Sequence, residues 1–180
     1  TFPAYSRLQH DRELLSKAIH KSFLFLALLS LPIAVGMIFM VKPLIAIIPR
    51  YSKWEPALFS FYLFTFSSVL ATLSSPLVNA LNALGKVRYT FYLMIMWTLL
   101  TWLLVPAFVY MFGYNGVAVA SVIIGFTSFI PLIIFRRIIP IRIFREIRYP
   151  LFSSVIMAVD LGVITVLVPT SSMKLFLGIV

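Results

Sequence analysis

Cysteine is absent from this sequence, and histidine and acidic residues are scarce. Among 180 residues there are no cysteines, two histidines and five aspartates and glutamates. Disulfide bonds, thiolate metal sites and a cysteine nucleophile are therefore excluded, and no nucleotide-binding loop, hydrolase motif or zinc motif occurs. Charged residues make up 11% and hydrophobic residues 62% of the chain, whereas soluble domains have roughly 25% charged residues. The composition argues against an enzyme and predicts a membrane protein that needs neither metal nor cofactor.

Long uncharged runs divide the chain into membrane-spanning segments. About 20 mostly apolar residues suffice to cross a hydrocarbon core of roughly 30 Å as an α-helix. The cluster Gly113-Tyr114-Asn115-Gly116 is a turn signal that divides the longest run in two. The predicted spans are about 22–48, 57–84, 90–112, 116–135 and 150–168, with the start of a truncated sixth span at 171–180. We therefore predict an all-α membrane protein, with a single transmembrane bundle over 1–180.

Basic residues are unevenly distributed between alternate segments of the chain. Eleven lie in segments 1–21, 85–89 and 136–149, and four lie in the segments between. The two groups are Arg7, Arg12, Lys17, Lys21, Lys86, Arg88, Arg136, Arg137, Arg142, Arg145 and Arg148 against Lys42, Arg50, Lys53 and Lys174. This positive-inside pattern predicts a multi-pass protein of the cell membrane with residue 1 on the cytoplasmic side. Because the charge is divided among short loops, nucleic acid is not an expected partner.

Two cytoplasmic segments, 1–21 and 141–149, combine basic and apolar residues. Such amphipathic segments lie in the headgroup plane of a membrane, where their positive charge attracts anionic lipid. We predict short interfacial helices there, with membrane lipid as a partner. Two interpretations stay open: ordinary topological anchors, or specific recognition of a lipid.

Polar side chains recur along one face of the span 57–84. They follow steps of three or four residues and fit within an arc of roughly 100°; they are Thr65, Ser68, Thr72, Ser75, Asn79 and Asn82. The opposite side, which includes Leu73 and Leu77, is predicted to face lipid. Because hydrocarbon offers no hydrogen-bond partners, the polar face should look into protein or into a wet cavity. It could serve helix packing or line a substrate path.

Two charged residues stand apart from the loops. Asp160 lies at mid-span, where an aspartate costs roughly 2.5–3.5 kcal/mol, and it is a candidate for ion coupling or a neutral group bonded to a neighbouring helix. Lys42 lies near the outer end of its span, from where its amine can reach the interface and could hold an anionic head group.

Small residues at Gly116, Ala120 and Gly125 predict close helix packing.

Several motifs, in order, resemble the C-terminal half of polysaccharide and lipid-linked oligosaccharide flippases. They are Pro3-Ala4-Tyr5-Ser6-Arg7-Leu8, Leu31-Pro32-Ile33, the pair Tyr51 and Trp54, Leu81-Asn82-Ala83-Leu84-Gly85-Lys86, and Gly113-Tyr114-Asn115-Gly116-Val117-Ala118-Val119-Ala120. The resemblance implies membership of the multidrug-oligosaccharidyl-lipid-polysaccharide exporter superfamily. It also implies a fold of two pseudo-symmetric bundles around a central cavity, so an N-terminal bundle of the same protein is expected as a partner.

The resemblance further implies a function. A flippase passes a lipid-linked saccharide across the membrane by alternating access, and the first complete span, 22–48, would line its cavity through Ser30, Ala34 or Lys42. The twelfth helix of that fold, to which 150–168 corresponds, is peripheral, which argues against a transport role for Asp160. The alternatives are a multidrug or cation exporter of the same superfamily, and a membrane scaffold subunit that transports nothing.

Overall fold

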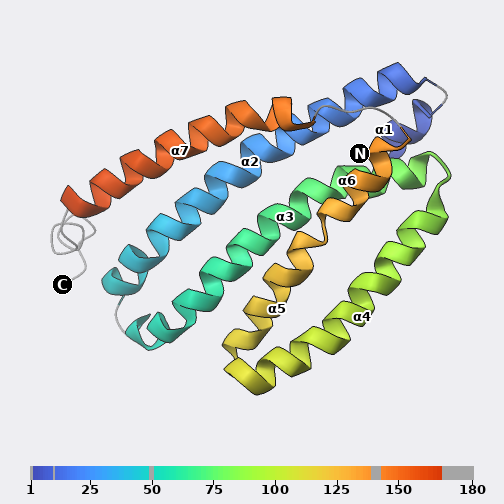
Figure 1. Cartoon of the computed structure of the whole chain (residues 1–180). Helices are drawn as coiled ribbons and strands as arrows, with labels where there is room; N and C mark the ends of the chain where they lie inside the picture. Colours follow the sequence, from blue (N-terminus) through green and yellow to red (C-terminus); the bar gives the residue numbers. More distant parts are fainter. Residues whose placement is uncertain (1, 10, 49–50, 139–142, 168–180) are drawn as a thin grey trace.

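The computed structural model describes residues 2–9, 11–48, 51–138 and 143–167 (Figure 1). Over these residues the chain is helical and contains no strand, which confirms the predicted all-α class. The elements are α1 (Phe2–Arg7), α2 (Arg12–Ile47), the 3₁₀-helix η1 (Tyr51–Ala57), α3 (Leu58–Ala83), α4 (Val87–Phe112), α5 (Asn115–Phe126), α6 (Phe129–Arg136) and α7 (Ile143–Leu167).

Four stretches of the described chain are long and apolar enough to cross a membrane, and the chain is a multi-pass membrane protein. They are Glu13–Ala46, Tyr51–Ala83, Val87–Phe112 and Asn115–Arg136. The predicted fifth span, 150–168, overlaps α7. The predicted start of a sixth span, 171–180, lies outside the described residues.

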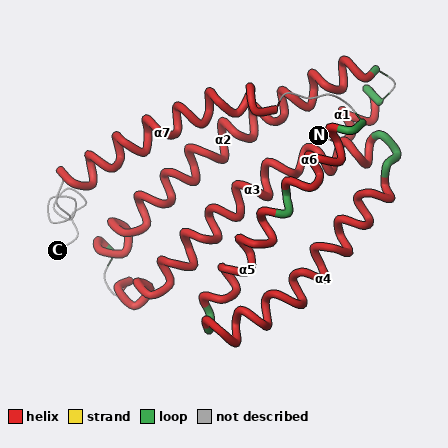
Figure 2. The backbone as a smooth tube through the Cα atoms, viewed as in Figure 1, coloured by secondary structure: helices red, strands yellow, loops and turns green. Residues whose placement is uncertain are grey.

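Helix boundaries differ from the predicted pattern at three places, one of which is the segment 141–149, where α7 runs on from Ile143 into the predicted span 150–168. The second half of the amphipathic segment 1–21 is not separate from the first span, because α2 continues without a break from Arg12 to Ile47, whereas α1 is a short helix of its own. At about 1.5 Å per residue this helix is roughly 54 Å long, so its first turns extend beyond a hydrocarbon core of roughly 30 Å. The predicted single span 116–135 is divided into α5 and α6 by a short loop at Thr127 and Ser128 (Figure 2).

The long helices lie side by side in the order α7, α2, α3, α5 with α6, and α4 (Figure 1). At one end of this row, α1, the first turns of α2, the α3–α4 turn and the end of α6 come together. We call it the basic end, because it holds Arg7, Lys17, Lys21, Lys86, Arg88, Arg136 and Arg137. The opposite end, with η1 and the α4–α5 turn, is the far end. The charge alternation therefore separates the two ends in space, while the cytoplasmic orientation stays a prediction.

The best-buried side chains gather at the basic end. We call this cluster the basal core; it contains Tyr5, Leu15, Ile19, Phe23, Leu77, Ala80, Leu81, Ala83, Leu93 and Phe135. It joins α1, α2, α3, α4 and α6 in one contact region. The Tyr5 hydroxyl is buried and has no hydrogen-bond partner in the described part of the chain. Desolvation by burial raises the pKa of Tyr5, so the phenol stays neutral inside the cluster.

Close packing holds α5 against α3 and α4, as the small residues predict. Gly116, Ala120 and Gly125 are buried. Ser67 Oγ donates a hydrogen bond to the carbonyl oxygen of Ser121 at 2.8 Å. Such a bond requires the two backbones to approach closely, which small side chains permit.

Candidate functional site

Two of the four hydroxyls of the polar stripe on α3 bond to their own helix. Thr65 Oγ1 donates to the carbonyl oxygen of Phe61, and Thr72 Oγ1 donates to that of Ser68, both at 2.8 Å. A serine or threonine that bonds back by one turn needs no partner on another helix. The assumption that the polar face must find protein or water therefore does not hold for these residues.

The exposed and buried faces of α3 therefore differ from the predicted ones. Ser68 and Ser75, on the polar stripe, are exposed. Leu77, predicted to face lipid, is 1% exposed and belongs to the basal core, and Leu73 packs against that core. The prediction of a lipid-facing side is wrong for these two leucines, because α1 and α6 cover that part of α3.

The first groove lies between α2 and α3 and brings three predicted site residues together. Ser30 from α2 and Ser68 and Thr72 from α3 line a volume of about 390 Å³. The other residues that line it are Ile33, Ala34, Met37, Phe61, Phe64, Thr65 and Val69. Ser30 and Ser68 each lie near the middle of their spans, Glu13–Ala46 and Tyr51–Ala83. The α2/α3 groove is thus an apolar trough at membrane depth with hydroxyls on both walls.

Ser30 differs from the other hydroxyls of this groove. Its Oγ atom is buried and has no hydrogen-bond partner in the described part of the chain. A buried polar atom without a partner costs roughly 1–3 kcal/mol. The α2/α3 groove therefore contains an unsatisfied hydroxyl that a bound molecule with a polar group could satisfy.

A second groove lies on the other side of α3. Ser75 and Asn79 line it together with residues of α4 and α5, and its volume is about 660 Å³. Its remaining polar lining comes from Ser67, Ser74, Trp97, Thr101, Ser121 and Ser128. The stripe is therefore divided: Thr65, Ser68 and Thr72 line the α2/α3 groove, and Ser75 and Asn79 line this α3/α5 groove. Sequence reasoning missed Trp97 and Ser121, because α4 and α5 are apolar nearly all round and show no polar stripe.

Three predicted residues line neither of these grooves. Asn82 lies near the end of α3 with its Oδ1 buried and unpartnered within the described residues. Lys42 is exposed near the far end, in a groove of about 400 Å³ that Ser52 and Glu55 also line. Asp160 is exposed on α7. The structure thus separates the two charged candidates from the hydroxyl-lined grooves.

Metal ligands are not grouped in the described residues: no three histidine, aspartate or glutamate side chains there lie close enough to hold an ion. Both α2/α3 and α3/α5 grooves are lined by neutral residues. Their chemistry is that of hydrogen bonding and apolar contact.

Comparison with known proteins gives one finding. Residues 1–59 match a family model described as "Polysaccharide biosynthesis protein". The match spans α1, α2 and η1 and ends at the start of α3, so it includes Ser30 but not Ser68 or Thr72. No curated protein and no solved structure matches the chain. The comparison supports a role in polysaccharide biosynthesis.

Proposed function

We propose that this chain is part of a flippase that translocates lipid-linked saccharides across the cell membrane during polysaccharide biosynthesis. The α2/α3 groove forms part of the substrate path, and transport proceeds by alternating access against an N-terminal bundle of the same protein. The chain is not itself an enzyme, it needs no cofactor, and residue 1 faces the cytoplasm.

The unsatisfied Ser30 hydroxyl, in an apolar groove that Ser68 and Thr72 also line, is the observation that carries this proposal. A lipid-linked saccharide is an amphiphile that must bring hydroxyl groups through hydrocarbon. Hydroxyls on the trough walls can exchange hydrogen bonds with sugar hydroxyls, and the surrounding side chains, such as Phe61 and Phe64, can contact the lipid chain. The match of α1 and α2 to a polysaccharide biosynthesis family supports the choice of substrate.

A multidrug or cation exporter of the same superfamily is the second candidate. A cation path should contain carboxylates, and neither groove beside α3 has one among its described lining residues. Asp160 and Glu55 are the observations that favour this candidate, but both lie away from those grooves. A non-transporting scaffold is the third candidate, and no observation on the described residues favours it.

The test is a flipping assay on the full-length protein in proteoliposomes, with a fluorescent lipid-linked oligosaccharide and a membrane-impermeant quencher. We expect Ser30→Ala to slow flipping by about threefold to tenfold, which corresponds to one lost hydrogen bond. Its stability should be unchanged or higher, because the substitution removes an unsatisfied buried atom. A merely structural role for Ser30 would not give slower transport in a more stable protein.

The matched control is Ser75→Ala, which removes a hydroxyl from the same helix but from the α3/α5 groove. We expect it to flip at the wild-type rate. If Ser75→Ala is slow and Ser30→Ala is not, the path runs through the α3/α5 groove. Drug efflux without any flipping of the saccharide lipid would overturn the proposed function.

Asp160 gives a separate prediction about ion coupling. If its carboxyl carries a proton during transport, Asp160→Asn should insert normally and lose the dependence of flipping on a pH gradient. The measurement is the flipping rate with and without an imposed gradient. Equal gradient dependence in the variant and the wild type would show that Asp160 is not the coupling residue.

A further inference from the structure

A third groove, at the basic end, combines positive charge with apolar surface. It lies where α1 meets the first turns of α2 and has a volume of about 540 Å³. Lys17, His20 and Lys21 line it on one side, and Leu8, Leu14 and Leu24 supply most of the apolar lining. We call it the corner groove. Along α2, the groove lies where the charged first turns end and the uncharged run that begins at Ser22 starts.

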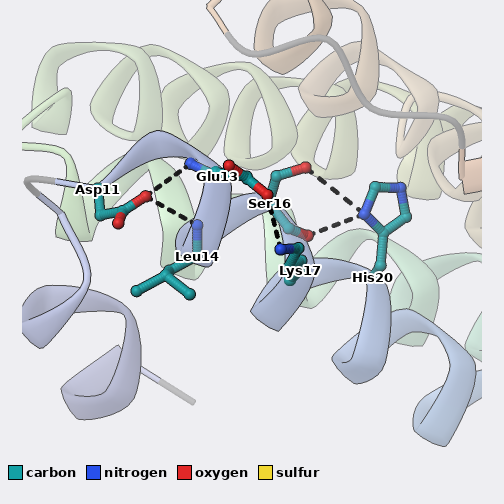
Figure 3. A network of polar contacts seen from close by, with 6 residues as sticks. All are labelled: Asp11, Glu13, Leu14, Ser16, Lys17 and His20. Atoms are coloured by element: carbon teal, nitrogen blue, oxygen red, sulfur yellow. Dashed lines mark hydrogen bonds and ion pairs between the residues drawn. The ribbon is translucent and has the colours of Figure 1, made fainter.

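The acidic residues of this corner are already engaged (Figure 3). Asp11 caps α2, and its Oδ1 accepts hydrogen bonds from the backbone amides of Glu13 and Leu14 at 2.9 and 3.0 Å. Glu13 pairs with Lys17 at 2.6 Å. Lys21 forms no ion pair with any described residue. The positive charge of Lys21 at this corner is therefore not neutralised by a carboxylate of the described residues.

The orientation of this helix face is fixed by the basal core. Leu15 and Ile19 are fully buried on the opposite side of the same turns, so α2 cannot rotate its basic side chains away from the groove. Nδ1 of His20 lies 2.9 Å from the carbonyl oxygen of Ser16, and because a carbonyl only accepts, this nitrogen carries the proton. Lys17 and Lys21 are four residues apart and so lie on one side of the helix.

We propose that the corner groove binds an anionic membrane phospholipid, with Lys17 and Lys21 on its phosphate and Leu8, Leu14 and Leu24 against its acyl chains. Charge complementarity selects this occupant. A helix that leaves the hydrocarbon at this level meets lipid headgroups, and lysines near an anionic surface are attracted to it. The apolar lining distinguishes an amphiphilic ligand from a free anion.

The experiment measures the binding of phosphatidylglycerol to the purified full-length protein by native mass spectrometry, with phosphatidylcholine as the neutral reference. We expect the wild type to prefer phosphatidylglycerol and the double variant Lys17→Gln/Lys21→Gln to bind it about tenfold more weakly. Both side chains are exposed, so the variant should keep its fold, which circular dichroism would check. Glu13→Gln, which releases Lys17 from its ion pair, should strengthen binding.

The matched control is the double variant Lys86→Gln/Arg88→Gln, which removes two exposed positive charges from the same end of the molecule but outside the groove. It should leave phosphatidylglycerol binding unchanged. An equal loss in Lys86→Gln/Arg88→Gln and in Lys17→Gln/Lys21→Gln would show a general surface potential and overturn the proposal, as would equal binding of the two lipids by the wild type. Displacement of the lipid by millimolar inorganic phosphate would also overturn it, because the site would then serve a free anion.

Discussion

Gly116→Ala is expected to destabilise the bundle by roughly 3 kcal/mol, at the upper end of the usual cost of overpacking. A Cβ atom at this position would overlap the backbone carbonyl of Phe108 and would lie 2.6 Å from the amide nitrogen of Val109. Backbone atoms of a helix cannot move aside as a flexible side chain can, so α5 would have to separate from α4. Reversible unfolding in mixed detergent micelles would measure the loss.

Two other glycines serve as controls, because alanine should cost less stability at each of them than at Gly116. A Cβ at Gly125 would lie 3.1 Å from the hydroxyl of Ser67, which can rotate by a small amount, so Gly125→Ala should cost less than Gly116→Ala. A Cβ at Gly36 would meet only Met157, at an ordinary 3.6 Å. Because alanine favours a helix interior over glycine by up to about 1 kcal/mol, Gly36→Ala should be neutral or stabilising. A stable Gly116→Ala protein would contradict the packing described for α5.

Phe135→Ala is the second substitution with a large expected effect. Phe135 is fully buried in the basal core at the end of α6, and replacing a buried phenylalanine with alanine costs roughly 3–5 kcal/mol through lost contacts and the cavity left behind. The same unfolding assay would report it. Because the basal core joins five helices, the variant should also unfold less cooperatively at the basic end, which hydrogen exchange of the α1 amides would detect.

The control for this substitution lies on the same helix. Phe129 is 45% exposed, so Phe129→Ala removes the same atoms from α6 without opening an internal cavity. We expect its unfolding free energy to stay within about 0.5 kcal/mol of the wild type, as for most exposed positions. Equal losses in Phe129→Ala and Phe135→Ala would mean that the basal core does not hold the helices together.

The distribution of buried residues bears on the proposed transport. The basal core packs the helices firmly at the basic end, and the α2/α3 groove and the α3/α5 groove flank α3 along the rest of its length. If transport requires α2 and α3 to move against another bundle, the tightly packed end can act as the fixed point. The hydroxyls of α3 that bond to their own helix would then stay satisfied when the helices separate.

Properties that depend on local chain composition were predictable from the sequence. A run of apolar residues stays apolar whatever packs beside it, so the helical class and the spans around α3 and α4 follow directly. The separation of positive charge also follows, because consecutive spans reverse direction and bring alternate loops to one end. The turn at Gly113 is a local feature as well, since a backbone φ of +60° favours glycine.

The sites were only partly predictable. The polar stripe on α3 was visible from its spacing, but the sequence could not show that Ser68 and Thr72 line one groove with Ser30 while Ser75 and Asn79 line another with α4 and α5. A hydroxyl can bond to its own helix, to another helix or to a ligand, and these choices have similar energies. Contacts with α1 and α6, distant in the sequence, also decided that Leu77 lies in the core.

An all-α membrane protein with its positive charge at one end thus follows from the amino-acid sequence. Tertiary structure alone decided which polar atoms are satisfied and which helix faces are open. The physical reason is that transfer of a helix into hydrocarbon depends on its own side chains, whereas the satisfaction of Ser30 Oγ and the overlap at Gly116 depend on what a neighbouring helix places beside them.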